Sequence, residues 1–105
     1  MLFPLPPIAD AALQQFCAKH NLYEAIAAGY HYAQKFFLTD QIRIDFYPPY
    51  RDDEPEEAMI DFVIETDMTA NEARDARRQF IEATNDVPGA FYLTIDIRFS
   101  DYEPS

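Results

Sequence analysis

Residues 59–72, Met59-Ile-Asp-Phe-Val-Ile-Glu-Thr-Asp-Met-Thr-Ala-Asn-Glu72, predict a strand that is followed directly by a helix. Apolar and polar residues alternate over residues 58–66, which is typical of a strand with one buried face. Thr69 and Glu72 then form a capping box, in which the threonine hydroxyl accepts a backbone N–H of the first turn and the glutamate accepts the N–H of the threonine. We therefore predict a strand over 58–66 and a helix that begins at Thr69 and is ended by Pro88-Gly89.

Two further alternating runs flank this unit. Residues 41–47 alternate apolar and polar side chains and stop at Pro48-Pro49, because proline cannot donate a hydrogen bond within a sheet. Residues 90–100 carry the longest alternation, and their apolar positions are Phe91, Leu93, Ile95, Ile97 and Phe99. A strand–helix–strand crossover makes the second and third strands parallel, and the first and second can pair antiparallel through the loop between them. The sequence allows the third strand to sit beside either of the other two.

The sequence of the first 38 residues predicts an extended arm followed by two helices. Residues 1–9 contain three prolines among large apolar residues, which predicts an extended arm that lies over the core or on a second subunit. Asp10 suits the N-cap of a helix over 10–20, and apolar residues at helical spacing predict a second helix over 22–38. Asn21 marks the break between these helices, with one long helix as the alternative.

A chain of 105 residues is long enough for one domain with one core. We predict an α+β fold in which two N-terminal helices precede a ββαβ unit, with a three-stranded mixed sheet and the helices on one face. The divisions are the apolar arm (1–9), the helical part (10–38), the strand–loop–strand–helix–strand part (41–99) and a polar tail (100–105).

The charge is concentrated in the middle of the chain. The net charge is −11, and residues 40–67 hold ten acidic side chains against Arg43 and Arg51. Such a field repels nucleic acid and anionic membranes and favours a basic protein partner, although the same charge also keeps a small aromatic-rich protein in solution. We expect a protein partner or self-association, and neither nucleic acid nor a membrane as partner.

Cysteine usage and the N-terminus bear on the compartment. One cysteine, Cys17, rules out an internal disulfide and fits a reducing compartment. The first residues lack the basic segment and long apolar run of a signal peptide, and no window approaches the ~18 uncharged apolar residues of a transmembrane helix. We expect a cytoplasmic protein.

The sheet face turned away from the helices is the candidate interaction surface. The alternation places on it the polar positions of the strands, and three tyrosines fall near strand ends and the acidic loop. A flat apolar ring with a polar tip suits partial burial at an interface. With the acids of the loop, the candidate residues are Asp45, Tyr47, Tyr50, Asp52, Asp53, Asp61, Glu65, Tyr92 and Asp96.

The alternative function is a small metal-binding or hydrolytic domain. It would use the carboxylates of the open face, Asp45, Asp61, Glu65 and Asp96, as ligands or as an acid–base pair. Arginines on the same face can pair with these carboxylates, so a solvated or partner-binding face is the favoured interpretation. Cys17 and His20 lie one helical turn apart, but zinc needs three or four ligands and there is no second cysteine.

Motifs for nucleophilic or nucleotide chemistry are missing from the sequence. Two glycines cannot form a phosphate loop or a dinucleotide fingerprint, and serine occurs only at positions 100 and 105. Arg74, Arg77 and Arg78 form a basic cluster that we expect to pair with neighbouring acids rather than with nucleic acid. We therefore predict an interaction module rather than an enzyme, with no catalytic residue, metal ligand or cofactor.

The order of strand, acid- and proline-rich loop, strand, capped helix and strand resembles small, acidic, uncharacterised bacterial α+β proteins. The segments that carry the resemblance are Ile42-Arg-Ile-Asp-Phe46, Asp52-Asp-Glu-Pro-Glu-Glu57, Ile60-Asp-Phe-Val-Ile-Glu-Thr-Asp67 and Phe80-Ile81. Some of these proteins act as partners, or as antitoxin-like neutralisers, of larger proteins. The resemblance therefore implies function through contact with a protein, and it carries over no catalytic residue.

Overall fold

Helices and strands follow one another in the predicted order in the computed structural model, which describes residues 3–51 and 53–99. The elements are α1 (Ala11–His20), α2 (Tyr23–Phe37), β1 (Ile42–Tyr47), the short 3₁₀ helix η1 (Pro55–Glu57), β2 (Met59–Thr66), α3 (Ala70–Thr84), the 3₁₀ helix η2 (Ala90–Tyr92) and β3 (Leu93–Phe99). The prediction of an α+β fold with three α-helices and a three-stranded mixed sheet is confirmed. The predicted tail, 100–105, lies outside the described residues.

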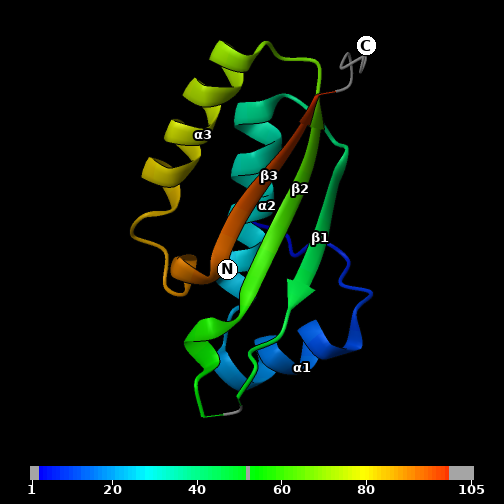
Figure 1. The fold of residues 1–105 in the computed structure, drawn as a ribbon, viewed down its shortest axis with the longest axis vertical. Helices are drawn as coiled ribbons and strands as arrows, with labels where there is room; N and C mark the ends of the chain where they lie inside the picture. Colours follow the sequence, from blue (N-terminus) through cyan, green and yellow to red (C-terminus); the bar gives the residue numbers. More distant parts are fainter. Residues whose placement is uncertain (1–2, 52, 100–105) are drawn as a thin grey trace.

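The central strand of the sheet is β2, because the strand order is β1-β2-β3 (Figure 1). β1 pairs antiparallel with β2, with Ile44 opposite Phe62, and β3 pairs parallel with β2, with Ile95 opposite Phe62. Of the two strand orders that the sequence allowed, the third strand takes the place beside the second. Residues Ile60, Phe62 and Ile64 of β2 are fully buried, so the core is centred on the helix-facing side of this strand.

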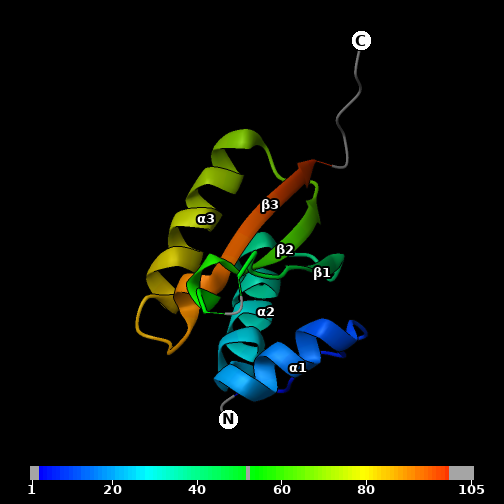
Figure 2. The same ribbon diagram turned by 60° about the horizontal axis from the view of Figure 1, so that its bottom comes forward.

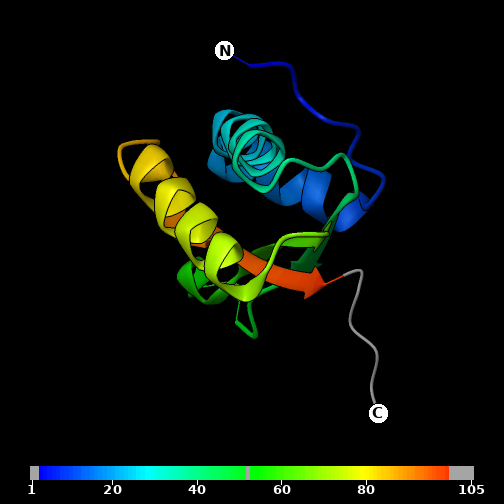
Figure 3. The same ribbon diagram turned by 90° about the horizontal axis from the view of Figure 1, so that it is seen from above.

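The α-helices lie together on one side of the sheet, as the view from above shows (Figure 3). α2 lies between α3 and α1 (Figure 2). Gly29 lets α2 approach the sheet closely, since a Cβ at this position would lie 2.9 Å from the ring of Phe62 and 3.1 Å from Leu93. Phe80 of α3 meets the same phenylalanine, with ring centroids 6.4 Å apart.

Local signals mark the ends of the helices. The Asp10 carboxylate accepts the backbone N–H of Ala12 at 2.8 Å, and the capping box of Thr69 and Glu72 is formed as predicted. Asn21 is in the left-handed conformation at a φ of 55°, which ends α1 and confirms two helices rather than one. α3 ends at Thr84, ahead of the predicted stop at Pro88-Gly89.

The prediction of a strand from residue 90 was wrong at its start. Gly89 adopts a φ of 86°, and the next three residues form η2, so that β3 begins at Leu93. A 3₁₀ turn does not preserve the two-residue alternation of a strand. Consequently Phe91 is 72% exposed and Tyr92 only 6% exposed, the reverse of what the alternation predicted.

The arm lies over its own chain where it is described. Pro6 is buried, and the ring of Phe3 stacks on that of His31 in α2 at a centroid distance of 4.0 Å. Residues 6–10 run beside the outer edge of β1, with a hollow of about 400 Å³ between them. Residues 3–9 therefore lie against their own chain, and contact of the arm with a second subunit stays a prediction. Across the described residues, no helix combines the length and the apolar character needed to cross a membrane.

Candidate functional site

The open face of the sheet, toward the viewer in Figure 1, presents the alternate residues of three strands in rows. One row places Asp45 opposite Asp61, which in turn lies opposite Thr94. The next row places Arg43 and Asp96 on either side of Val63. Four of the predicted surface carboxylates therefore belong to this face, since Glu65 follows one row further along β2, opposite Arg98.

Two of these carboxylates are held by arginines of their own strands. The guanidinium of Arg43 donates to both oxygens of Asp45, at 3.0 and 3.1 Å. The guanidinium of Arg98 donates to one oxygen of Asp96 at 2.8 and 3.1 Å, and this hydrogen bonding lowers the pKa of Asp96. The same pairing raises the pKa of both arginines. Asp45 and Asp96 are thus ion-paired rather than free.

The centre of the open face is covered by its own neighbours. Asp61 is 9% exposed and Val63 is 5% exposed, although neither faces the helices. β2 is the central strand, so side chains from β1 and β3 lie on both sides of these two residues. The Asp61 carboxylate accepts a hydrogen bond from the Thr94 hydroxyl at 3.0 Å. Asp61 is therefore a poor contact residue for a partner, which corrects its predicted place on the surface.

The carboxylates were also the basis of the metal-binding alternative. Within residues 3–51 and 53–99, no group of three His, Cys, Asp or Glu side chains is arranged so that it could hold a metal ion. Cys17 is buried, and this burial raises the pKa of its thiol to about 11. His20 instead packs its ring against that of Phe16, at a centroid distance of 4.4 Å.

The end of the sheet nearest the acidic loop carries exposed apolar side chains. Tyr47, the last residue of β1, lies opposite Met59, the first residue of β2, and both are about half exposed. Tyr50 follows within the loop and is 96% exposed. We call Tyr47, Tyr50 and Met59 the tyrosine patch. A ring as exposed as that of Tyr50 makes few contacts within its own chain. Large exposed aromatic side chains of this kind are typical of residues that contact a partner.

Acidic side chains border the tyrosine patch on the loop that joins β1 to β2. Asp53, Glu56 and Glu57 are exposed, and Glu54 is partly so. Hydrogen bonding to Glu54 and the negative charges of Glu54 and Glu56 raise the pKa of Glu57. Arg51 reaches Glu54 at 3.7 Å. In the described part of this loop an arginine reaches only Glu54, whereas two of the four carboxylates on the open face, Asp45 and Asp96, are each paired with an arginine. Asp52, a predicted surface residue, lies outside the described residues.

A groove of about 270 Å³ lies on the helix side of the same loop. Its apolar lining consists of Phe16, Phe46, Pro48, Pro49, Pro55 and Ala12. Gln15, Lys19 and His20 of α1 supply its polar side chains. The groove and the tyrosine patch flank one loop, so a partner that binds there has both an apolar slot and exposed rings to contact.

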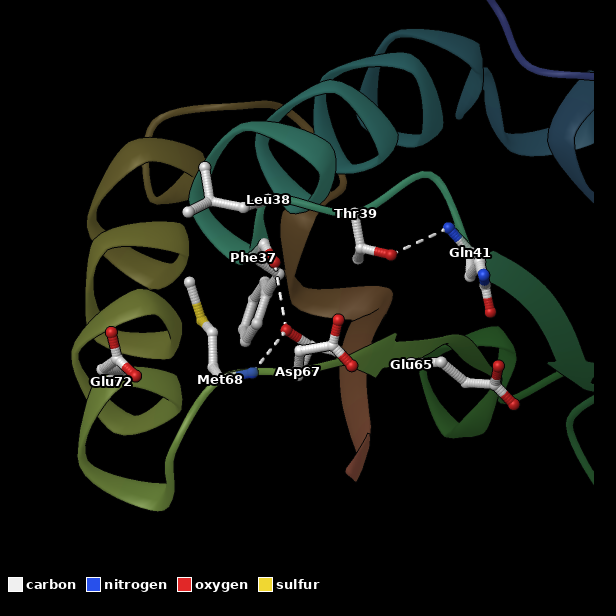
Figure 4. A pocket seen from close by; sticks show the side chains of 9 residues that line it. Phe37, Leu38, Thr39, Gln41, Glu65, Asp67, Met68 and Glu72 are labelled. Carbon is white, nitrogen blue, oxygen red and sulfur yellow. Dashed lines mark hydrogen bonds between the residues drawn. The ribbon is translucent and has the colours of Figure 1, made fainter. Parts of the chain in front are cut away.

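The remaining predicted surface residues are dispersed. Tyr92 is buried in η2, with its ring 5.4 Å from that of Phe16 in an edge-to-face arrangement, so it does not belong to the surface. Glu65 is exposed at the opposite end of the sheet and lines a polar hollow of about 300 Å³ (Figure 4). There the Thr66 hydroxyl donates to the Phe37 carbonyl at 3.1 Å and ties the end of β2 to the end of α2. Glu72 of the same hollow is engaged in the cap of α3.

The basic cluster on α3 behaves partly as predicted. Arg74, Arg77 and Arg78 are all exposed, and Arg78 reaches Asp75 at 3.4 Å within the helix.

The structure adds Met59 and the apolar groove to the predicted surface residues. Met59 could have been recognised from the sequence, because the antiparallel pairing of 41–47 with 58–66 brings the two ends that flank the loop together. The groove depends on where α1 packs, for which the sequence has no signal.

Comparisons with protein-family models, with curated proteins and with solved structures found no match to this chain. The resemblance to small acidic bacterial proteins therefore stays a prediction.

Proposed function

We propose that this chain is a protein-interaction module that binds a basic protein through the tyrosine patch and the acidic loop. The observation that carries the proposal is the difference between two groups of acids. On the open face Asp45 and Asp96 are neutralised by arginines, while in the loop the pKa of Glu57 is raised by its acidic neighbours. Among the described residues Asp53, Glu56 and Glu57 form no ion pair, and such charge beside exposed rings suits a partner that brings lysine or arginine together with apolar side chains.

The apolar features define the anchor of such a contact. Interfaces are stabilised mainly by a few large side chains that become fully desolvated, with charged residues at the rim. Tyr50 and Tyr47 are the exposed rings, and the groove between the loop and α1 accepts a side chain of the partner. The loop acids then steer the basic partner toward this end of the molecule.

Site-specific photo-crosslinking in the cells that make the protein tests the proposal. A photoreactive phenylalanine analogue at Tyr50 should give an adduct with a basic protein, because this ring lies in the contact. The matched control is the same analogue at Leu38, which is 79% exposed at the opposite end of the sheet and should give no such adduct. The charge reversals Glu56→Lys and Glu57→Lys together should abolish the adduct at position 50. An equal yield at both positions, or no adduct at position 50, contradicts the proposal.

A further inference from the structure

The two outer edges of the sheet differ in how they are protected. The edge of β1 is flanked by residues 6–10 of the arm, and the strand is followed by Pro48 and Pro49. Within residues 3–51 and 53–99, β3 pairs with β2 on one side only, and the strand contains no proline. An edge strand of seven residues that no other described strand pairs with presents backbone N–H and C=O groups for a further strand.

The apolar side chains of β3 are also incompletely buried. Ile60, Phe62 and Ile64 of β2 are fully buried beneath the helices, whereas their β3 neighbours Leu93, Ile95 and Ile97 are only half-buried. Phe99, at the end of the strand, is exposed. A further strand beside Ile95, Ile97 and Phe99 would remove water from this part of the row and would extend the apolar face of the sheet.

We propose that the occupant of this edge is a second copy of the chain, whose β3 pairs antiparallel with the first to form a six-stranded sheet across a two-fold axis. Strand addition at an exposed edge gains main-chain hydrogen bonds and contacts between alternate side chains. A two-fold axis makes the same patch serve on both copies, as in most homodimers.

The charges of β3 select one register. Directly opposed residues of the two copies point to the same face of the sheet. The two-fold axis must therefore pass between one residue of β3 and the same residue of the other copy. A register centred on Asp96 would set two aspartates face to face, which is destabilising. A register centred on Ile97 instead sets Asp96 of each copy opposite Arg98 of the other. Since Arg98 already holds Asp96 at 2.8 Å within one chain, the pairing joins two ion pairs into one network of alternating charge.

The same register keeps the acidic loops apart. The loop ends just before β2, whose residue Ile60 lies opposite Leu93 of β3, so the loop is roughly 20 Å along the strands from Ile97. Antiparallel pairing about Ile97 then places the loops of the two copies at opposite ends of the sheet, roughly 40 Å apart. This exceeds the Debye length of about 8 Å at physiological salt, so the repulsion between the two acidic loops is largely screened. Both tyrosine patches stay accessible.

Disulfide trapping tests the register directly. In this pairing the two copies of residue 97 face each other with Cα atoms about 4.5–5.5 Å apart, within the range of about 4.4–6.8 Å that a disulfide spans. Ile97→Cys should therefore give a covalent dimer under mild oxidation. Ile95→Cys is the matched control, because it lies on the same face of β3 but roughly 13 Å from its copy. Cys17 can stay in both variants, since it is buried and un-ionised.

Mass in solution and charge reversal complete the test. Light scattering with size exclusion should give twice the mass of the 12.2 kDa chain, shifting to the single mass on dilution. Asp96→Arg sets arginine opposite arginine at two places and should give a monomer, whereas Asp96→Arg with Arg98→Asp restores the alternation and should recover the dimer. Circular dichroism verifies folding of each variant. A single mass for the unaltered chain at all concentrations, or equal trapping of Ile95→Cys and Ile97→Cys, overturns the proposal.

Discussion

Asp45 and Asp61 lie directly opposite each other on the antiparallel strands β1 and β2, in the middle of the open sheet face. Like charges in this relationship are destabilising. Each carboxylate has its own compensation, since Asp45 is bound by Arg43 and Asp61 accepts the hydroxyl of Thr94. The ion pair and the hydrogen bond therefore reduce the repulsion between Asp45 and Asp61 but do not cancel it, because no arginine pairs with Asp61 among the described residues.

Replacing Asp61 should reveal the repulsion. In Asp61→Asn the side-chain oxygen still accepts from Thr94, but the charge opposite Asp45 is gone. We expect the free energy of unfolding at neutral pH, measured with urea, to rise by about 0.2–1 kcal/mol. Thr94→Val is the control for the hydrogen bond and should lower this free energy. A destabilised Asp61→Asn would mean that the charge itself is needed, for example to attract Arg98.

The start of β3 can be tested with two neighbouring aromatic residues. Tyr92 is buried against Phe16, so Tyr92→Ala should lower the free energy of unfolding by about 3–5 kcal/mol, as for other large buried rings. Phe91 is exposed, so Phe91→Ala should change it by less than about 0.5 kcal/mol. Chemical denaturation of the two variants measures both. The opposite ranking is what a strand that began at residue 90 would give.

The sequence predicted the elements because their signals are local. The cap at Thr69, the break at Asn21 and the alternation in β1 and β2 each depend on neighbouring residues, and all are observed. The start of β3 was missed because the positive φ of Gly89 leads into a turn of three residues that shifts the alternation. A turn of this kind leaves the order of apolar and polar residues looking unbroken.

The candidate surface was predicted less well because exposure depends on strand order. The alternation assigns Asp61 correctly to the face away from the helices, but only the central position of β2 shows that this residue is covered. Likewise, Tyr47 and Met59 become one patch through cross-strand pairing. The sequence predicts this pairing but does not show that both side chains are exposed. The Phe16 side of the groove depends on the packing of α1, which leaves no pattern in the sequence.

Gly29 should resist substitution for a steric reason. Alanine favours a helix over glycine by about 1 kcal/mol, yet its Cβ at this position would lie 2.9 Å from the fully buried ring of Phe62. Overpacking of a core costs about 1–3 kcal/mol, so Gly29→Ala should lower the free energy of unfolding despite the gain in helix propensity. The double variant Gly29→Ala with Phe62→Leu should be more stable than the sum of the two separate changes predicts. Strict additivity would show that the two residues do not press on each other.

The capping box should contribute measurably to stability and to its pH dependence. Thr69→Ala removes the acceptor of the Glu72 N–H and should cost about 1 kcal/mol. The Glu72 carboxylate accepts the Thr69 N–H, which lowers its pKa. Its contribution is therefore present above the ordinary carboxyl pKa and is lost as the pH falls through the lowered value. Glu72→Gln keeps an acceptor without a titrating group, so thermal melts of this variant should depend less on pH below about pH 4.

Glu57 should have the opposite dependence on pH. Its pKa is raised, so the folded chain binds a proton at this site more readily than the unfolded chain does. The stability of the unaltered protein should then decrease as the pH rises through the interval between the ordinary and the raised value. Glu57→Gln removes this repulsion, so its melting temperature should exceed that of the unaltered protein at neutral pH and approach it in acid.

Glu82→Gln is the matched control for Glu57→Gln, because Glu82 is an exposed glutamate on α3, away from the loop. It should leave the pH profile of the melting temperature unchanged. If Glu57→Gln also leaves the profile unchanged, the loop carboxylates do not crowd one another in solution. The electrostatic reason to expect a basic partner at the tyrosine patch would then be removed.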